Sequence, residues 1–298
     1  MGSDKRYGDV GNPIAAKVIG KMKQAVRGKL IDLKSVVAGH ADDAELQKQV
    51  ATKSGLSGFH PAHAAYVYAQ NQVSAISEQL AALKEMTPFV DIVSQAEDLY
   101  LPSGPPMSPL TTSYFTCWAF FDACTGSAHE TIGTTILDLG AAFGMSPELW
   151  HLIKLLQDSR MGLYIHRGVE GSLVLLEDVV TGGICRAVSP AGYRGDKNEL
   201  WYVRVLPPPI GDTSEHVAFT TPYIVMQPEV HDWLAYFSRT FAHNQQARVE
   251  DYERHMKYGP TRAYWNDFVF EAYVNHRQEA IYLAGLPDIP ESRPHSRK

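Results

Sequence analysis

The chain has 298 residues, of which 45% are hydrophobic and 20% charged. This composition is sufficient for a packed core and excludes a largely disordered chain. No window approaches 18 uninterrupted apolar residues, and several lysines and arginines interrupt the N-terminal segment. Neither a membrane-spanning helix nor a secretion signal is therefore expected, and we predict a cytoplasmic protein.

Cysteine content and charge exclude further classes. Three cysteines without a CxxC pair or zinc-ribbon spacing favour a reducing compartment and buried thiols; they are Cys117, Cys124 and Cys185. The net charge is −6, but residues 1–37 carry a local charge of +5, so the remaining chain carries −11. An acidic body argues against a protein that wraps duplex nucleic acid, because that requires a broad basic face.

Proline positions mark the expected starts of helices. Proline is favoured at the first helical position because its missing N–H needs no partner there. Seven prolines precede a stretch with helical character: Pro13, Pro61, Pro88, Pro109, Pro147, Pro228 and Pro260. An eighth start is expected at Ser127, because Glu130 follows at the spacing of a capping box.

The first predicted helix, over residues 13–38, is basic and amphipathic. Its apolar residues recur at steps of three and four, and lysines and arginines occupy the rest of its surface. Because the apolar stripe has to be buried, we expect this helix to dock onto an acidic surface, most simply that of its own chain. A separate acidic partner, an anionic membrane and nucleic-acid phosphate are the alternatives.

Several further segments predict core helices. Residues 61–84 carry apolar side chains in a 4-3 rhythm over three heptads, which is typical of a packing seam. Residues 109–124 are rich in aromatic side chains, and Asp122 is their only charge. With helices expected over 128–143 and 147–158, residues 1–160 form a predicted N-terminal helical region.

After Arg160 the hydrophobic period changes from 3.6 to 2. Short runs rich in Val, Ile, Leu and Tyr, separated by turns rich in Gly and Pro, predict strands. These runs cover residues 161–166, 173–180, 184–188, 200–206 and 217–225. We predict a five-stranded antiparallel β meander or small half-barrel over residues 161–227, with one face buried.

The chain is expected to return to helix after residue 227. Residues 228–258 and 261–284 are rich in aromatic side chains and predict helices that pack back on the helical body, in a region spanning 228–286. Residues 287–298 predict a disordered tail. The predicted fold class is α+β: a mainly helical body of about 8–9 helices with an inserted β module.

No sequence motif identifies an enzyme class. The chain lacks the Gly-rich phosphate loops, the GxSxG elbow, the HExxH zinc motif and the EF-hand loop, so no cofactor-binding residue is predicted. Two histidines at a helix entrance, His60 and His63, could bind a metal or act as acid and base. A capping role for His60 and an exposed His63 are the simpler interpretation, because a metal needs further ligands.

Lone carboxylates on otherwise uncharged helices form a second candidate group. Glu78, Asp122 and Asp138, with His129 close in sequence, are the kinds of ligand with which helical bundles hold divalent metals. No Glu-x-x-His pair occurs among them, and a hydrogen bond could satisfy each carboxylate in place. A divalent metal is therefore expected only if the protein is an enzyme.

Two more groups of polar residues have both a chemical and a structural interpretation. Asp251 and His255 are spaced so that the carboxylate could orient the imidazole as a base, although a solvated helix face explains them as well. Arg186, Arg204 and His216 could bind an anion at the mouth of the β module, or they could form cross-strand ion pairs.

These observations leave two hypotheses for the function. The first is a binding or regulatory protein, in which the β module and the aromatic-rich helices recognise a protein partner or a small ligand. The second is a metal-assisted hydrolase or oxygenase with its site in the helical bundle. The first ranks higher because catalytic signatures are missing.

Overall fold

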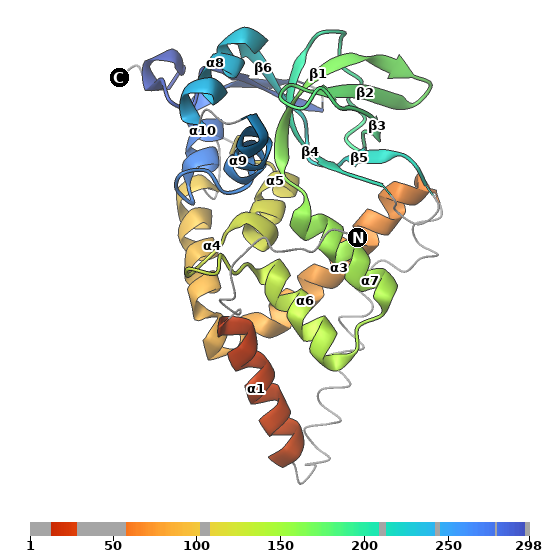
Figure 1. Cartoon of the computed structure of the whole chain (residues 1–298), viewed down its shortest axis with the longest axis vertical. Coiled ribbons are helices and arrows are strands. Elements are labelled where there is room, and N and C mark those ends of the chain that lie inside the picture. Colours follow the sequence, from red (N-terminus) through yellow and green to blue (C-terminus); the bar gives the residue numbers. More distant parts are fainter. Residues whose placement is uncertain are drawn as a thin grey trace.

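The structure is a computed structural model that describes residues 13–28, 58–101, 108–208, 213–241, 245–277 and 279–295. Its strands gather at one end of the molecule with the last three helices beside them, and the N-terminal helices form the other end (Figure 1). No helix within these ranges is long and apolar enough to cross a membrane. The α+β fold class is confirmed.

The described helices follow the proline signals in part. They are α1 (Pro13–Gly28), α3 (Pro61–Ala81), α4 (Thr87–Tyr100), α5 (Thr112–Cys117), α6 (Ile132–Phe143), α7 (Pro147–Asp158), α8 (Val230–Thr240), α9 (Gln245–Tyr258) and α10 (Tyr264–Ala272). Short 3-10 turns form η2 (Lys84–Met86) and η4 (Pro290–Ser292), and η3 (Trp118–Asp122) is a π-helix that continues α5. Proline lies in the first turn of α1, α3, α4 and α7, as predicted.

The basic helix α1 docks onto the chain's own body. Its N-terminal amides at Ile14 and Ala15 donate to the buried carboxylate of Glu130, at 2.9 and 3.1 Å. A carboxylate at this end of a helix is favourable because the first amides lack helical partners and the dipole is positive there. The predicted capping box at Ser127 is therefore wrong, since α6 begins later, behind Thr131. Residues 29–38 of the predicted helix lie outside the described residues.

The strands form one sheet, part of which closes into a barrel. They are β1 (Met161–Glu170), β2 (Leu173–Asp178), β3 (Ile184–Val188), β4 (Leu200–Leu206), β5 (His216–Ala218), β6 (Tyr223–Gln227), β7 (Tyr273–Arg277) and β8 (Ala280–Ala284). The strand order is β1-β2-β3-β5-β4-β6-β8-β7, and an additional β1–β4 pairing closes the first five strands. The β3–β5 and β6–β8 pairs are parallel.

The predicted antiparallel meander is therefore wrong, and the length of β1 supplies the physical reason. This strand is ten residues long, so its first half pairs with β4 while its second half pairs with β2. A bulge between His166 and Gly168 separates the two halves, and Gly168 has a φ of +121° there. Bulges bend and twist a strand, which allows one strand to serve two neighbours in a closed barrel.

The C-terminal region also differs from the prediction. The helix expected over residues 261–284 ends at Ala272, and the following residues form the β7–β8 hairpin, which joins the sheet beside β6. A disordered tail was predicted over residues 287–298, of which the structure describes 287–295. There Arg293 is buried, and its Nε donates to Leu286 O at 3.1 Å. In both segments, contacts with residues distant in sequence outweigh the local pattern.

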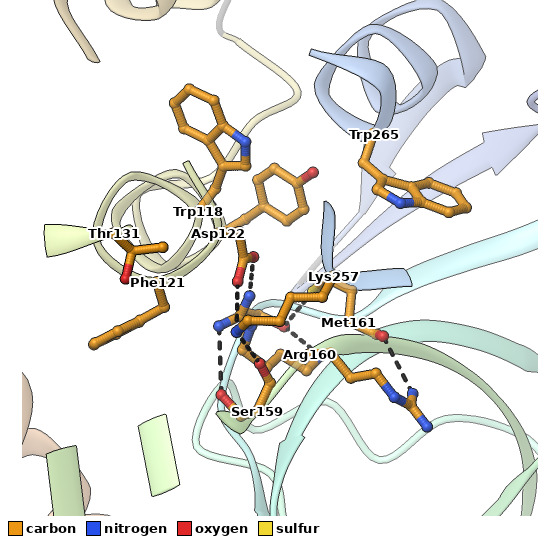
Figure 2. Close-up of polar contacts among 12 residues, drawn as sticks. Trp118, Phe121, Asp122, Thr131, Ser159, Arg160, Met161, Lys257 and Trp265 are labelled. Atoms are coloured by element: carbon orange, nitrogen blue, oxygen red, sulfur yellow. Dashed lines mark hydrogen bonds and ion pairs between the residues drawn. The ribbon is translucent and has the colours of Figure 1, made fainter. Parts of the chain in front are cut away.

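A buried ionic cluster connects the barrel to the helices. Arg204 lies on the outer face of β4 and is 1% exposed, and its guanidinium donates to Asp122 Oδ2 at the end of η3. Lys257 of α9 donates to the other carboxylate oxygen at 3.1 Å. The same ammonium donates to Gln157 O and Ser159 O at the C-terminus of α7, so all three of its protons have acceptors (Figure 2).

The hydrogen bonds of this cluster define its role. Burial lowers the pKa of Lys257 to about 8, while Asp122 opposes that shift. The ammonium also occupies the end of α7 where the helix dipole favours a cation. Because its protons are all engaged, Lys257 acts as a structural cross-link between α7, α9 and η3.

Replacing Asp122 by Asn should destabilise the fold strongly. The substitution leaves Arg204 and Lys257 buried without a counter-charge, and breaking such a pair costs about 3–5 kcal/mol. Urea denaturation of the full chain measures this loss. The matched control is Asp98→Asn on the exposed face of α4, which should change the free energy of unfolding by less than about 0.5 kcal/mol. Equal losses in the two variants would contradict a structural role for the cluster.

Candidate ligand-binding site

A cavity of about 340 Å³ lies at one end of the barrel. Four changes of secondary structure meet there: α7 leads into β1, β2 ends, β3 begins and β4 ends. The pairing register explains this, because antiparallel neighbours bring the first residue of β1 beside the last residues of β4. The lining residues are Asp158, Ser159, Arg160, Tyr164, Asp178, Gly183, Ile184, Cys185, Val205, Pro207, His216 and Glu253.

An ion pair between Arg160 and Asp178 forms one wall of the cavity. The guanidinium Nη2 lies 3.2 Å from Asp178 Oδ2, and the guanidinium carbon lies 4.6 Å from the centre of the Tyr252 ring. The second carboxylate oxygen accepts the amides of Val180 and Thr181, both at 2.9 Å. Interactions with Tyr252, Tyr164 and Asp178 raise the pKa of Arg160 above its usual value, despite its burial. Both charges are therefore fully engaged.

Gly162 provides the space through which Arg160 reaches this position. A Cβ at Gly162 would lie 2.6 Å from Arg160 Nη1 and 2.8 Å from the Tyr164 ring. Both distances are too short for a real side chain, so the guanidinium needs glycine at this step of β1. The Arg-Met-Gly sequence at the helix–strand junction thus has a steric reason that the sequence alone did not reveal.

The rest of the lining is apolar or neutral, apart from two carboxylates. Ile184, Val205 and Pro207 supply aliphatic surface. His216 is half-buried, and desolvation lowers its pKa, so its ring is neutral at pH 7. Its Nδ1 has no hydrogen-bond partner among the described residues. Asp158, the last residue of α7, and Glu253, in the middle of α9, are both exposed.

This arrangement is suited to holding a small organic molecule. Its volume is at the small end of the range for ligand cavities, and an apolar wall with a few polar groups is typical of such sites. Cys185 also lines the cavity, but burial raises the pKa of its thiol to about 12 and its Sγ contacts Leu176 O, so it is not a nucleophile at neutral pH. Searches of protein-family models, of curated proteins and of solved structures find no match for this chain.

The residues proposed as metal ligands are not brought together. His60 caps α3, with its Nδ1 accepting the Ala62 amide at 3.3 Å. The His63 ring meets Phe59 edge-on and stacks on Tyr66. Glu78 is exposed, and Asp122 is neutralised by its two cations. Asp138 on α6 and His129, which precedes that helix, do not complete a group of metal ligands either. Within the described ranges, no three His, Cys, Asp or Glu side chains form a group that could hold a metal ion.

The three residues proposed to bind an anion lie in different environments. Arg186 is exposed and pairs with Glu170 on the neighbouring part of the barrel, at 3.0 Å. Arg204 is fully enclosed and already bound to Asp122. Only His216 lines the cavity. Arg186 of β3 thus forms an ion pair with Glu170 of β1 across β2, and Arg204 forms one with Asp122.

The sequence suggested that His255 lies on a solvated helix face, but the structure shows that it is buried. It is 8% exposed among aromatic side chains, and its imidazole meets the hydroxyl of Tyr236. Burial lowers its pKa to about 4, so the ring is neutral in the folded protein. The aromatic residues around α9 in the sequence were the available signal, because they indicated that this helix is covered on several sides.

Sequence reasoning did not identify Arg160 or Glu253 as members of a site. Arg160 lies at the change of hydrophobic period, and Glu253 belongs to a run of charged residues on α9 that resembles an ordinary solvated face. Asp178 has a local structural role as well, because it is the last residue of β2 and its carboxylate binds two amides of the following turn.

Gly162→Ala should displace Arg160 and disrupt the wall of the cavity. We expect a loss of about 1–3 kcal/mol in the free energy of unfolding, the usual cost of forcing an extra methyl group into a filled space. Gly58→Ala is the control, because a Cβ at Gly58 meets no atom within 4 Å. Urea denaturation compares the two; an unchanged stability for Gly162→Ala would contradict the steric argument.

His255 should make the fold sensitive to acid. Its pKa is about 4 in the folded state and near 6.5 when unfolded, so between these values only the unfolded chain binds the proton. Stability present above pH 6.5 is thus lost as the pH falls towards 4, by about 3 kcal/mol in total. The free energy of unfolding of His255→Gln, measured by urea from pH 7 to 4, should fall less steeply than that of the unmodified chain. His231→Gln, at an exposed position, should keep the original slope.

Proposed function

We propose that the protein binds a small organic ligand in the cavity at the end of the barrel. The observation that carries this proposal is the cavity itself, about 340 Å³ with an aliphatic wall, an internal ion pair and a neutral imidazole. A binding role also agrees with the first hypothesis drawn from the sequence, in which the β module recognises a ligand.

The rigidity of the surroundings supports a preformed site. Strands β1 to β4 supply five of the twelve lining residues, and Arg160 is fixed by Asp178 on one side and by the Tyr252 ring on another. A binding group held by strands and paired charges loses little conformational freedom when a ligand arrives, which favours affinity. The protein would therefore take its ligand without a large rearrangement.

Blocking the cavity mouth tests the proposal. Ile184 is 65% exposed at the start of β3, so Ile184→Trp adds bulk at the opening without disturbing a packed core. A fragment set of cationic, neutral and anionic compounds would be screened against the full chain by ligand-observed NMR. Fragments that bind the unmodified protein should lose at least about tenfold in affinity with Ile184→Trp.

The control carries the same substitution elsewhere on the barrel. Val169 is 45% exposed on β1 and does not line the cavity, so Val169→Trp should leave fragment binding unchanged. Circular dichroism of both variants establishes that they fold. If no fragment distinguishes the two variants, the cavity is not a ligand site and the proposal fails.

The alternative function, a metal-assisted hydrolase or oxygenase, requires a metal site. Within the described residues, no three His, Cys, Asp or Glu side chains form a group that could hold a metal ion. His60 caps α3, and Asp122 is bound to Arg204 and Lys257.

A further inference from the structure

The charges around the cavity are not balanced. Arg160 and Asp178 neutralise each other, and the remaining oxygen of Asp178 is occupied by two backbone amides. Asp158 pairs with Lys154 one turn earlier on α7. His216 is neutral because burial lowers its pKa.

Glu253 is the lining residue whose charge has no counterpart. Among the described residues its carboxylate makes no hydrogen bond or ion pair, although its neighbour on α9, Lys257, is bound into the buried cluster. The cavity therefore combines aliphatic surface from β3 and β4 with a single uncompensated carboxylate from α9. A ligand that brings a positive charge would gain from this carboxylate, whereas an anion would be repelled.

The charge of the whole chain acts in the same direction. Outside residues 1–37 the protein carries a net charge of −11, which attracts small cations to its surface. The one guanidinium in the lining cannot offset this preference, because its hydrogen bonds to Asp178 and to Met161 O and its contact with the Tyr252 ring are already formed.

We propose that the ligand of this cavity is a small organic cation, with an ammonium or guanidinium group beside Glu253 and a short apolar portion against Ile184, Val205 and Pro207. This inference rests on the proposed function, since it assigns a ligand class to the same cavity. The neutral imidazole of His216 offers a further hydrogen-bonding group for a polar substituent on the ligand.

Three probes of similar shape and different charge test the ligand class. Pentylammonium, pentanol and pentanoate would be titrated into the full chain at pH 7 and low ionic strength, with calorimetry or NMR as the readout. Pentylammonium should bind most tightly, and its affinity should fall as salt is added, because exposed charges are screened.

Variants on α9 separate the charge from the cavity. Glu253→Gln should weaken pentylammonium binding about two- to fivefold, the range expected for one exposed ion pair, and should leave pentanol unaffected. Glu250→Gln on the same helix does not change the cavity lining and should bind all three probes like the unmodified chain.

The outcomes distinguish the two proposals. If pentanol or pentanoate binds at least as tightly as pentylammonium, and Ile184→Trp abolishes that binding, the cavity is a ligand site and the cationic assignment is wrong. If Glu253→Gln and Glu250→Gln weaken pentylammonium equally, Glu253 is not the anchor and the assignment fails. If no probe binds, or if Ile184→Trp does not change the binding of any probe, both the proposed function and the cationic assignment fail.

Discussion

The structure depends on the need to neutralise Arg204. This residue occupies the middle of β4, a strand that is buried on both faces because the barrel interior covers one side and the helices cover the other. An unpaired guanidinium could not remain there, since desolvating a charge costs several kcal/mol. Asp122, the last residue of the π-helix η3, forms an ion pair with Arg204, and Lys257 of α9 binds the same carboxylate. One buried carboxylate thus fixes the barrel, the N-terminal helices and the C-terminal helices relative to one another.

The same contacts determine where the cavity forms. Lys257 binds the last carbonyls of α7, and Ser159 donates back to Leu156 O while Arg204 reaches its hydroxyl. The chain therefore leaves α7 in a fixed direction, and the next residue, Arg160, turns across Gly162 to meet Asp178 at the end of β2. The wall of the proposed binding site is in this way a continuation of the buried cluster. Binding at the cavity and stability of the fold are expected to be coupled through α7.

Such a cluster stabilises less than apolar side chains of the same volume would, because the ion pairs must first offset the loss of hydration. The cluster instead selects one arrangement of the helices, because its hydrogen bonds require particular directions. Leucine at position 204 could pack against many helix arrangements, whereas Arg204 accepts only one that places Asp122 and the Ser159 hydroxyl at its nitrogens. Glu130 acts similarly at the start of α1, where its carboxylate accepts the first amides of that helix. From the sequence, Asp122 was a candidate metal ligand and Glu130 part of a capping box, so neither of these two contacts was predicted.

The sequence by itself determined the α+β class, the Pro-led starts of α1, α3, α4 and α7, and the change to strands at Met161, because these follow from local periodicity and from the missing N–H of proline. Only the tertiary structure decided that β1 closes a barrel and that residues 273–284 form strands, since both depend on pairing with distant segments. The same holds for the cavity. Arg160, His216 and Glu253 come from the link between α7 and β1, from β5 and from α9, and no spacing along the chain brings them together. His60 and His63, which are close in sequence, meet no third ligand within the described residues. The periodicity of apolar residues indicates which face of a helix or strand is buried. It does not indicate which distant segment covers that face, because this is decided only when the chain folds.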